Sequence, residues 1–323
     1  MNGNAALDQM EIFWDLNQIH SKQKSIVTIG TFDGVHRGHQ QIIQQMRDIA
    51  DRKDLITTLV TFEPHPQLVL RNKEKMPLRI LTTIEEKIDI LNRIGLERLV
   101  VANFNKDFSN IEPVDFIQNY LKKKLLLTEM VIGYDHSFGR NRKGNIELLQ
   151  RLANKLNFQV QALPAKTMDN QIISSTLIRS LIAEGSVGKA AKFLDRAYRL
   201  NGRVIRGDGR GKELGFPTAN IRPFSSYKLI PNAGVYTTLI TIEGHTFEST
   251  TYIGNRATFN LQKNVIEVYI HEFDDEIYNM KVDLEFIDFI RNDKKFESSK
   301  GLIEQIQEDI EQSRELFDKI RVN

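Results

Sequence analysis

The stretch Gly30-Thr31-Phe32-Asp33-Gly34-Val35-His36-Arg37-Gly38-His39 decides the fold of the first half of the chain. It follows the β-branched run Ser25–Ile29 and precedes apolar residues at three- and four-residue spacing, so it joins a predicted strand to a predicted helix. Backbone N–H groups at a helix start attract anions. Gly34 and Gly38 let the backbone approach phosphate oxygens closely. The stretch predicts a phosphate-binding turn.

Two histidines lie at the mouth of the predicted helix. His36 and His39 are three residues apart, so both imidazoles can face one point and stabilise charge on a phosphoryl group in transfer. A capped turn with two surface histidines is a plainer alternative. A His/Asp metal site is another, although a third ligand at suitable spacing is missing.

A second polar turn, Ile173–Arg179, follows the last predicted strand of this half and begins a helix. Its consecutive hydroxyls can simply cap that helix, or they can cradle a polyphosphate together with Arg179. The two turns, in this order, resemble the HxGH and ISSTxxR signature of the nucleotidylyltransferase superfamily. Enzymes of that superfamily cleave a nucleotide between its α and β phosphates.

Strand and helix patterns alternate through the first 185 residues, which predicts a parallel sheet with helices on both faces. Thr82 or Thr83 is expected to cap one helix, and Gly95 to end it. Ligands bind such sheets beyond the carboxyl ends of their strands. Either of the segments Thr61–Pro66 and Gly133–Gly139 can be a plain loop, but both fall at such ends, which favours contact with ligand. The predicted strands are Ser25–Ile29, Ile56–Phe62, Arg98–Ala102, Met130–Gly133 and Phe158–Leu163.

The pattern changes after Gly185 to short alternating strands separated by turns, which predicts a small antiparallel barrel. A closing helix is expected from about Ser299. We therefore expect a first domain over 1–185, a linker over 186–198 and a second domain over 199–323. The predicted barrel strands are Gly202–Gly211, Gly234–Glu243, Phe247–Gly254, Val265–Phe273 and Lys281–Ile290.

The run Gly207–Asn220 is rich in glycine and polar residues. It can fold over phosphates, or it can be a long hairpin loop. It is not a Walker A motif, because no Gly-Lys-Ser/Thr follows at the required spacing. A hairpin loop does not explain Pro217-Thr218-Ala219-Asn220, in which a hydroxyl and an amide are hard oxygen ligands suited to Mg²⁺.

Glu267 lies in the predicted strand Val265–Ile270, on the face opposite Ile266 and Val268. A carboxylate there can accept a proton from an attacking hydroxyl. A solvated acid on a strand face is the plainer alternative.

Composition excludes several classes of protein. The 323 residues are 41% hydrophobic and 27% charged, which excludes a fibrous chain or one disordered throughout. The 44 Lys and Arg nearly balance the 42 Asp and Glu, so we expect no nucleic-acid partner. Without cysteine, disulfides and thiol catalysis are impossible. No signal peptide or membrane span is expected, which favours a cytoplasmic protein.

Nine segments together resemble one family, the bacterial bifunctional riboflavin kinase/FAD synthetase. The resemblance implies an α/β Rossmann-like nucleotidylyltransferase domain, followed by a small antiparallel six-stranded β-barrel of the riboflavin kinase type with a C-terminal helix. The matched segments are GTFDGVHRGH, TFEPHP, GYDHSFG, SSTLIR, FLDRAY, the Gly-rich run to LGFPTAN, PNAGVY, YIGNRATF and IEVYIHEF.

The resemblance implies two reactions and their substrates, ATP, riboflavin and FMN. The barrel would transfer the γ-phosphate of ATP to the 5′-hydroxyl of riboflavin, giving FMN. The first domain would join FMN to the AMP part of a second ATP, giving FAD and pyrophosphate. Mg²⁺ is the implied cofactor. Oligomeric state does not follow from the sequence.

The resemblance also assigns roles to residues of this chain. Glu267 would be the kinase base, and His36 and His39 would stabilise the adenylyl transition state. Thr218 and Asn220 would hold Mg²⁺–ATP. The expected flavin contacts are Phe62, His65 and Asp135. The expected nucleotide contacts are Gly30, Phe32, Asp33, Gly34, Ser174, Ser175, Thr176, Arg179, Gly207, Gly209 and Gly215.

The chain departs from the family pattern at several positions, most of them in or near the barrel. We therefore expect the kinase to be affected more than the adenylyltransferase. One alternative is a barrel that binds flavin without phosphorylating it, against which Thr218, Asn220 and Glu267 argue. Another is a flavin-sensing regulator, against which the balanced charge argues. The departures are Leu177, Asp195, Ala197, Ala257, His271 and Asn279.

Overall fold

We describe the protein from a computed structural model, which covers residues 9–70, 78–134, 138–139, 144–207, 209–258 and 261–322. The chain divides into two compact units, Met1–Ser175 and Thr176–Asn323. Within the covered ranges, none of the helices combines the length and apolar character that crossing a membrane requires.

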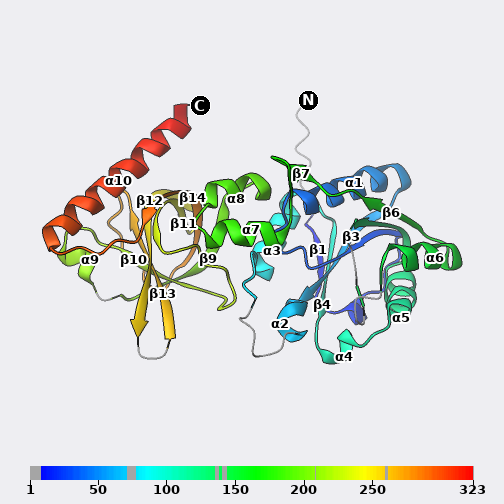
Figure 1. Ribbon diagram of the computed structural model, residues 1–323. Helices are drawn as coiled ribbons and strands as arrows, with labels where there is room; N and C mark the ends of the chain where they lie inside the picture. Colours follow the sequence, from blue (N-terminus) through cyan, green and yellow to red (C-terminus); the bar gives the residue numbers. More distant parts are fainter. Residues whose placement is uncertain are drawn as a thin grey trace. The chain divides into compact units, whose positions relative to one another are not determined.

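A parallel sheet forms the centre of the first unit (Figure 1). Its strand order is β1-β4-β3-β2-β5-β6, with every neighbouring pair parallel. The chain runs outward from β2 in one direction through β3 and β4, and then returns to the other side of β2 for β5 and β6. The carboxyl end of β2 is therefore the topological switch point, where sheets of this kind bind ligands. The strands are β1 (Glu11–Phe13), β2 (Ser25–Ile29), β3 (Ile56–Glu63), β4 (Arg98–Asn103), β5 (Leu127–Gly133) and β6 (Gln159–Leu163).

Helices cover both faces of this sheet because side chains alternate along each strand. Ile26 of β2 belongs to a core formed with α1 (Arg37–Lys53) and α3 (Ile84–Arg93). Val27, the next residue, belongs to the opposite core, with the π-helical segment η2 (Phe116–Lys122) and with α6 (Ile146–Leu156). Shorter elements are η1 (Leu16–Gln18), α2 (Pro66–Leu70), α4 (Lys106–Ser109), α5 (Pro113–Asp115), β7 (Thr167–Met168) and β8 (Gln171–Ile172).

Helix α3 begins and ends where its sequence predicts. The Thr83 side chain accepts a hydrogen bond from the Glu86 N–H, and the Glu86 carboxylate accepts one from the Thr83 N–H. This reciprocal capping box satisfies two N–H groups at the helix start. Gly95 follows the helix with φ +78°, a conformation that glycine adopts without strain. The capping of α3 fixes the segment that packs against the turn after β2.

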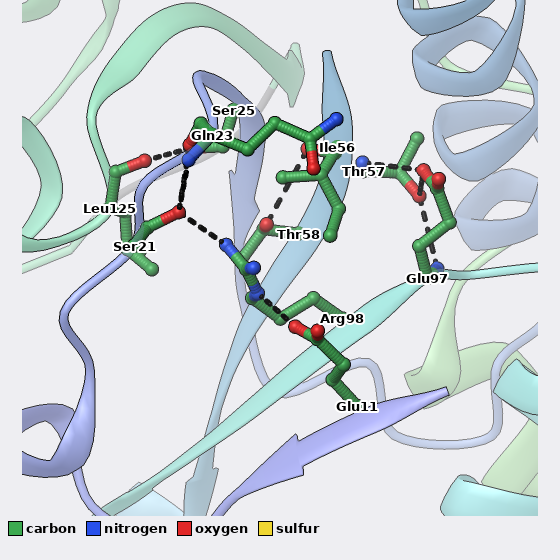
Figure 2. A network of polar contacts seen from close by, with 10 residues as sticks. All are labelled: Glu11, Ser21, Gln23, Ser25, Ile56, Thr57, Thr58, Glu97, Arg98 and Leu125. Atoms are coloured by element: carbon green, nitrogen blue, oxygen red, sulfur yellow. Dashed lines mark hydrogen bonds and ion pairs between the residues drawn. The ribbon is translucent and has the colours of Figure 1, made fainter. Parts of the chain in front are cut away.

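Polar contacts at the amino ends of the strands attach β1 to the sheet edge (Figure 2). Arg98, which is 6% exposed, donates from Nε to the Glu11 carboxylate at 2.8 Å and from Nη1 to the Ser21 hydroxyl at 3.0 Å. Glu97 accepts from both the N–H and the hydroxyl of Thr57, each at 2.8 Å. These contacts lie opposite the ligand-binding edge, so their role is to hold the fold.

The second unit contains a closed antiparallel barrel with the order β10-β13-β12-β11-β14-β9, in which β9 also pairs with β10. Alternate residues, such as Tyr198, Leu200 and Val204 of β9, fill the interior. The fold class expected from the sequence is confirmed. The strands are β9 (Tyr198–Ile205), β10 (Ala219–Pro223), β11 (Gly234–Ile242), β12 (His245–Thr258), β13 (Leu261–Ile270) and β14 (Lys281–Asn292).

The long helix α10 (Ser299–Val322) packs on the outside of the barrel beside β12 (Figure 1). Ile310 and Phe317 of this helix are buried. The carboxylate of Asp309 accepts two hydrogen bonds of 2.7 Å from the Arg291 guanidinium of β14, a bidentate pair that fixes the helix orientation. The other helices of this part are α7 (Ser175–Ala183), α8 (Val187–Leu194) and α9 (Arg210–Glu213).

Several element boundaries differ from the sequence prediction. The strand expected over Gly202–Gly211 ends at Ile205, because the glycines that follow form a loop that leads into α9. The short strands β1 and β10 were not predicted. The region 186–198, expected as a linker, contains α8 with Phe193 and Leu194 buried. The domain boundaries 1–185 and 199–323 stay a prediction.

Candidate active sites

The turn between β2 and α1 is held by the backbone at the start of α3. The carboxylate of Asp33, which is 2% exposed, accepts hydrogen bonds from the N–H groups of Leu81 at 2.9 Å and Thr82 at 3.0 Å. The Gly34 N–H donates to the Thr82 hydroxyl at 3.0 Å. Gly34 has φ +85°, and Val35 has φ +38°. Asp33 thus fixes a turn whose backbone is unusually bent.

Three aromatic rings stack at the mouth of α1. The ring centroids of His36 and His39 lie 3.7 Å apart, and those of His39 and Phe32 lie 4.4 Å apart. A Cβ atom on Gly38 would lie 3.2 Å from the His36 ring, so glycine there allows the ring to fold against the helix. His36 precedes α1 and makes no side-chain cap of the helix. The structure therefore brings both imidazoles together at the switch point.

Ser175 brings the second polar turn, Ile173–Arg179 (the serine turn), into contact with the turn that carries His36 and His39 (the histidine turn). The Ser175 hydroxyl donates to the Asp33 carbonyl oxygen at 2.8 Å, across 142 residues of sequence. Ser174 precedes it, and Thr176 and Arg179 follow along α7. Ser175, at the start of α7, is thereby joined to the turn that carries His36. Ser175 is thus in contact with the turn at the carboxyl end of β2, although 142 residues separate it from Asp33 in the sequence.

Lys87 contacts the turn between β2 and α1 and was not predicted as a site residue. It is 4% exposed and donates from Nζ to the Thr31 carbonyl oxygen at 2.7 Å and to the Thr61 hydroxyl at 3.2 Å. Burial lowers the pKa of Lys87, while the charges of Asp33 and Glu63 oppose that shift. Burial likewise raises the pKa of Glu63, which the charge of Lys87 opposes. The sequence does contain a signal for this role, because Lys87 is a charged residue on the buried, otherwise mainly apolar face of α3.

The predicted flavin contacts follow β3 and β5. Phe62 lies near the end of β3 with its ring edge-on to those of Phe104 and Phe108, at centroid distances of 5.7 and 5.8 Å. His65 accepts a hydrogen bond at Nδ1 from the Gln67 N–H at 3.2 Å. Asp135 lies outside the described residues. Contact of these residues with flavin stays a prediction.

In the barrel, the glycine-rich loop passes directly over β10 and the residues before it. A Cβ atom on Gly207 would overlap the side-chain amide of Asn220, and one on Gly211 would lie 3.0 Å from the Thr218 hydroxyl. Gly209 and Gly215 have φ of +75° and +87°, which glycine alone adopts readily. Glycine at positions 207 and 211 therefore lets the loop backbone lie directly against Asn220 and Thr218.

Glu267 lies beside Asn220 in the barrel wall. The two residues are direct partners in the β10–β13 ladder, and Tyr252 of β12 is the partner of Glu267 on its other side. Direct partners point to the same face, with Cα atoms about 4.5–5.5 Å apart. Ile266 and Val268 are buried inside, so the predicted alternation is confirmed. Burial, with help from the charges of Asp293 and Glu267, raises the pKa of Tyr252 to about 12.

Two departures from the family pattern have a structural explanation. Asn279 stands where the family pattern has glycine, and its φ is +64°. Apart from glycine, asparagine adopts this left-handed conformation more readily than most residues. Its N–H donates to the Val204 carbonyl oxygen at 3.0 Å. His271 is buried, with Nε2 2.9 Å from the Thr250 hydroxyl. Burial, with a smaller effect from Arg314, lowers the pKa of His271 to about 4.

Comparison with known proteins gives each unit its own match. The FAD synthetase family model matches residues 18–177, and the riboflavin kinase family model matches residues 194–317. The chain is 38% identical to the bifunctional riboflavin kinase/FMN adenylyltransferase of Listeria monocytogenes over 296 residues, which cover 91% of this chain and 93% of the relative. The protein of the same name from Bacillus subtilis is 34% identical over 302 residues, 92% of this chain and 94% of the relative. The chain belongs to the bifunctional riboflavin kinase/FMN adenylyltransferase family.

A solved structure has the same fold over nearly the whole chain. The crystal structure of a protein named as a macrolide-efflux protein from Streptococcus pneumoniae matches with a TM-score of 0.87 and 28% identity, covering 95% of this chain and 99% of that one. The two family models divide the sites between them. The FAD synthetase match contains the histidine and serine turns up to Leu177, and the riboflavin kinase match contains the glycine-rich loop and Glu267.

Proposed function

We propose that this member of the riboflavin kinase/FMN adenylyltransferase family makes FMN and FAD in two sites. The barrel transfers the γ-phosphate of ATP to the 5′-hydroxyl of riboflavin, giving FMN and ADP. The first unit transfers the AMP part of ATP to FMN, giving FAD and pyrophosphate. The observation that carries this proposal is that each unit contains its own polar turn and matches its own family model. The lack of cysteine agrees with a cytoplasmic location.

In the kinase reaction, Glu267 accepts the proton of the riboflavin 5′-hydroxyl as its oxygen attacks the γ-phosphorus. Its place beside Asn220 in the ladder supports this role, because base and phosphate-binding residues then share one face. Gly207, Gly209 and Gly215 let the loop cover the phosphates. No covalent intermediate with the enzyme is needed, so catalysis consists mainly of positioning and electrostatic stabilisation.

Thr218 and Asn220 suit a divalent cation. Their hydroxyl and amide oxygens are hard ligands of the kind that Mg²⁺ prefers. The loop glycines next to them support this, since a Cβ atom on Gly207 or Gly211 would reach the same two side chains. Bound there, Mg²⁺ would neutralise charge on the phosphates of ATP.

In the adenylyl transfer, His36 and His39 stabilise negative charge that builds on the α-phosphate. The backbone of Gly30, Phe32 and Gly34 lies at the switch point, where sheets of this kind bind their ligands. The pyrophosphate is held by the serine turn, in which the bond from Ser175 to Asp33 supports a shared site. Its remaining contacts are Ser174, Thr176 and Arg179. Phe62, His65 and Asp135 contact the flavin.

Product analysis tests both halves. The purified chain, incubated with riboflavin, ATP and Mg²⁺, should give FMN and then FAD, separated by chromatography. Glu267→Gln should abolish FMN formation from riboflavin and leave FAD formation from supplied FMN. His36→Ala should have the reverse effect. Equal loss of both activities in either variant would contradict two separate sites, and formation of neither flavin by the wild type would favour the regulator.

A further inference from the structure

Three cations form one row on the outer face of the barrel. Arg222 of β10 is the direct ladder partner of Arg203 of β9, and Arg203 is the direct partner of Lys281 of β14. Their side chains share the outer face, since Val204 and Ile221 beside them are buried inside. In the part of the chain that the structure describes, none of the three takes part in an ion pair. The row is a concentration of uncompensated positive charge.

Such a row destabilises the folded barrel unless an anion neutralises it, because like charges directly opposite each other in a ladder repel. Asp283, on the same face of β14, pairs instead with the Arg199 guanidinium at 3.8 Å. Arg203 donates to the Asn279 carbonyl oxygen, a neutral acceptor. Both observations leave the charge of the row available to a ligand.

A cavity of about 540 Å³ adjoins the two arginines. Its volume falls in the range of roughly 300–1,000 Å³ typical of small-molecule sites. Phe224 lines it with 49% of its surface exposed, and the Arg203 guanidinium lies 5.9 Å from the centroid of that ring. The Ser225 hydroxyl accepts from the Tyr227 N–H at 3.2 Å and keeps its own proton to donate. None of the lining residues is acidic.

We propose that this arginine cavity binds a nucleotide, with its phosphate on Arg203 and Arg222 and its flat ring against Phe224. Guanidinium groups bind phosphate oxygens through paired, charge-assisted hydrogen bonds, and an aromatic ring adds contact area for a second ring. An adenine nucleotide and a flavin nucleotide share this chemistry. The cavity is distinct from the proposed kinase site, because Thr218, Asn220 and Glu267 do not line it.

Equilibrium dialysis of the full chain tests the site, with ADP and FMN used separately as probes. Arg222→Ala should weaken the affinity for one of the two nucleotides by on the order of ten- to a hundredfold, as expected for losing a hydrogen bond to a charged group. A loss with ADP alone identifies an adenine nucleotide, and a loss with FMN alone a flavin nucleotide. Phe224→Ala should also weaken the affinity for the same nucleotide, because it removes the ring against which the flat ring of the nucleotide lies. Lys300→Ala, an exposed lysine of α10, is the control.

Two further measurements separate this site from other roles of Arg222. The variant without ligand should unfold at the same or a higher temperature than the wild type, since repulsion in the row is relieved. Inorganic pyrophosphate should raise the unfolding temperature of the wild type more than that of the variant. Equal binding of both probes by wild type and Arg222→Ala would overturn the proposal. A raised KM for ATP in riboflavin phosphorylation would overturn it too, by placing Arg222 in the kinase site.

Discussion

Lys87 Nζ lies 2.7 Å from the carbonyl oxygen of Thr31, inside the turn that carries His36. The same ammonium group reaches the Thr61 hydroxyl of β3, so one buried cation joins the turn, the sheet and α3. Asp33 joins the turn to the residues before α3 from the other direction. We therefore propose Lys87 as a positioning residue for the proposed adenylyl-transfer site.

Replacing Lys87 with Met should slow FAD formation from FMN and leave riboflavin phosphorylation unchanged. The Thr31 carbonyl and Thr61 hydroxyl would lose the hydrogen bonds that they accept from Lys87, which should lower the free energy of unfolding by about 1–3 kcal/mol. Chemical denaturation and separate assays of the two reactions measure these effects. Lys53→Met is the matched control, because Lys53 makes an exposed ion pair with Glu129 and should cost under about 1 kcal/mol. Equal effects of both substitutions would refute the positioning role.

Replacing His36 or His39 with Ala should raise the barrier of adenylyl transfer by about 2–4 kcal/mol. Because the two rings stack at 3.7 Å, their contributions are coupled, and the double variant should lose less than the sum of the single losses. The rate of FAD formation at saturating FMN and ATP measures the effect. His20→Ala, an exposed histidine of the same unit, should keep the wild-type rate. A His36→Ala enzyme that kept it as well would remove that histidine from the mechanism.

Gly207→Ala should lower the rate of riboflavin phosphorylation on the order of a hundredfold. Its Cβ atom would overlap the Asn220 amide, and a displacement of this size in a catalytic group commonly has such an effect. FAD formation from supplied FMN should not change. Gly301→Ala is the control, since its Cβ atom would lie 3.5 Å from the Ser298 hydroxyl and alanine favours the helix by about 1 kcal/mol. Unchanged phosphorylation in Gly207→Ala would show that the loop does not position Asn220.

His271→Leu should make the stability of the protein less sensitive to acid. Burial lowers the pKa of folded His271 to about 4 from 6.5, so the unfolded chain binds the proton first as the pH falls. The stability contributed by neutral His271 is present above pH 6.5 and is lost as the pH falls toward 4. Unfolding temperatures measured across this interval should fall less steeply in the variant. Parallel curves for wild type and variant would contradict this, and His245→Gln, at an exposed position, serves as control.

Arg98→Met should lower the free energy of unfolding by about 1–3 kcal/mol without changing KM for any substrate. The substitution keeps the apolar volume but removes the hydrogen bonds that the Ser21 hydroxyl and the Glu11 carboxylate accept from Arg98. Glu11 is half exposed and water can replace that donor, which limits the cost. Thermal and chemical denaturation measure the change. A change in KM with unaltered stability would place Arg98 in a binding site instead.

The sequence predicted those parts of the fold that depend on local pattern. Three such features are each read from residues within one helix or strand. They are the helical spacing of apolar residues after β2, the capping of α3 by Thr83 and the outward face of Glu267. Strand β10 was missed because Pro217 and Thr218 precede its five residues and Asn220 and Pro223 lie within it, a composition typical of a loop. Strand β1 was missed because three residues show no period.

The sequence names candidate site residues, whose roles stay a prediction, but it does not show the contacts between them. Asp33 is expected from the resemblance to contact nucleotide, and that contact stays a prediction. The structure adds that its carboxylate accepts hydrogen bonds from the backbone N–H groups of Leu81 and Thr82. The role of Lys87 depends on contacts with residues more than 25 positions away, which no local pattern contains. The cation row likewise depends on which strands are neighbours in the closed barrel.

The proposed kinase site depends on the lengths of its strands as well as on its side chains. Asn220 and Glu267 share a face because β10 and β13 pair in one particular alignment. Deleting a single residue from β13 ahead of Glu267 would turn this carboxylate into the barrel interior and bring an aliphatic neighbour out in its place. A kinase built on this wall should therefore tolerate many substitutions along β13 and almost no insertions or deletions.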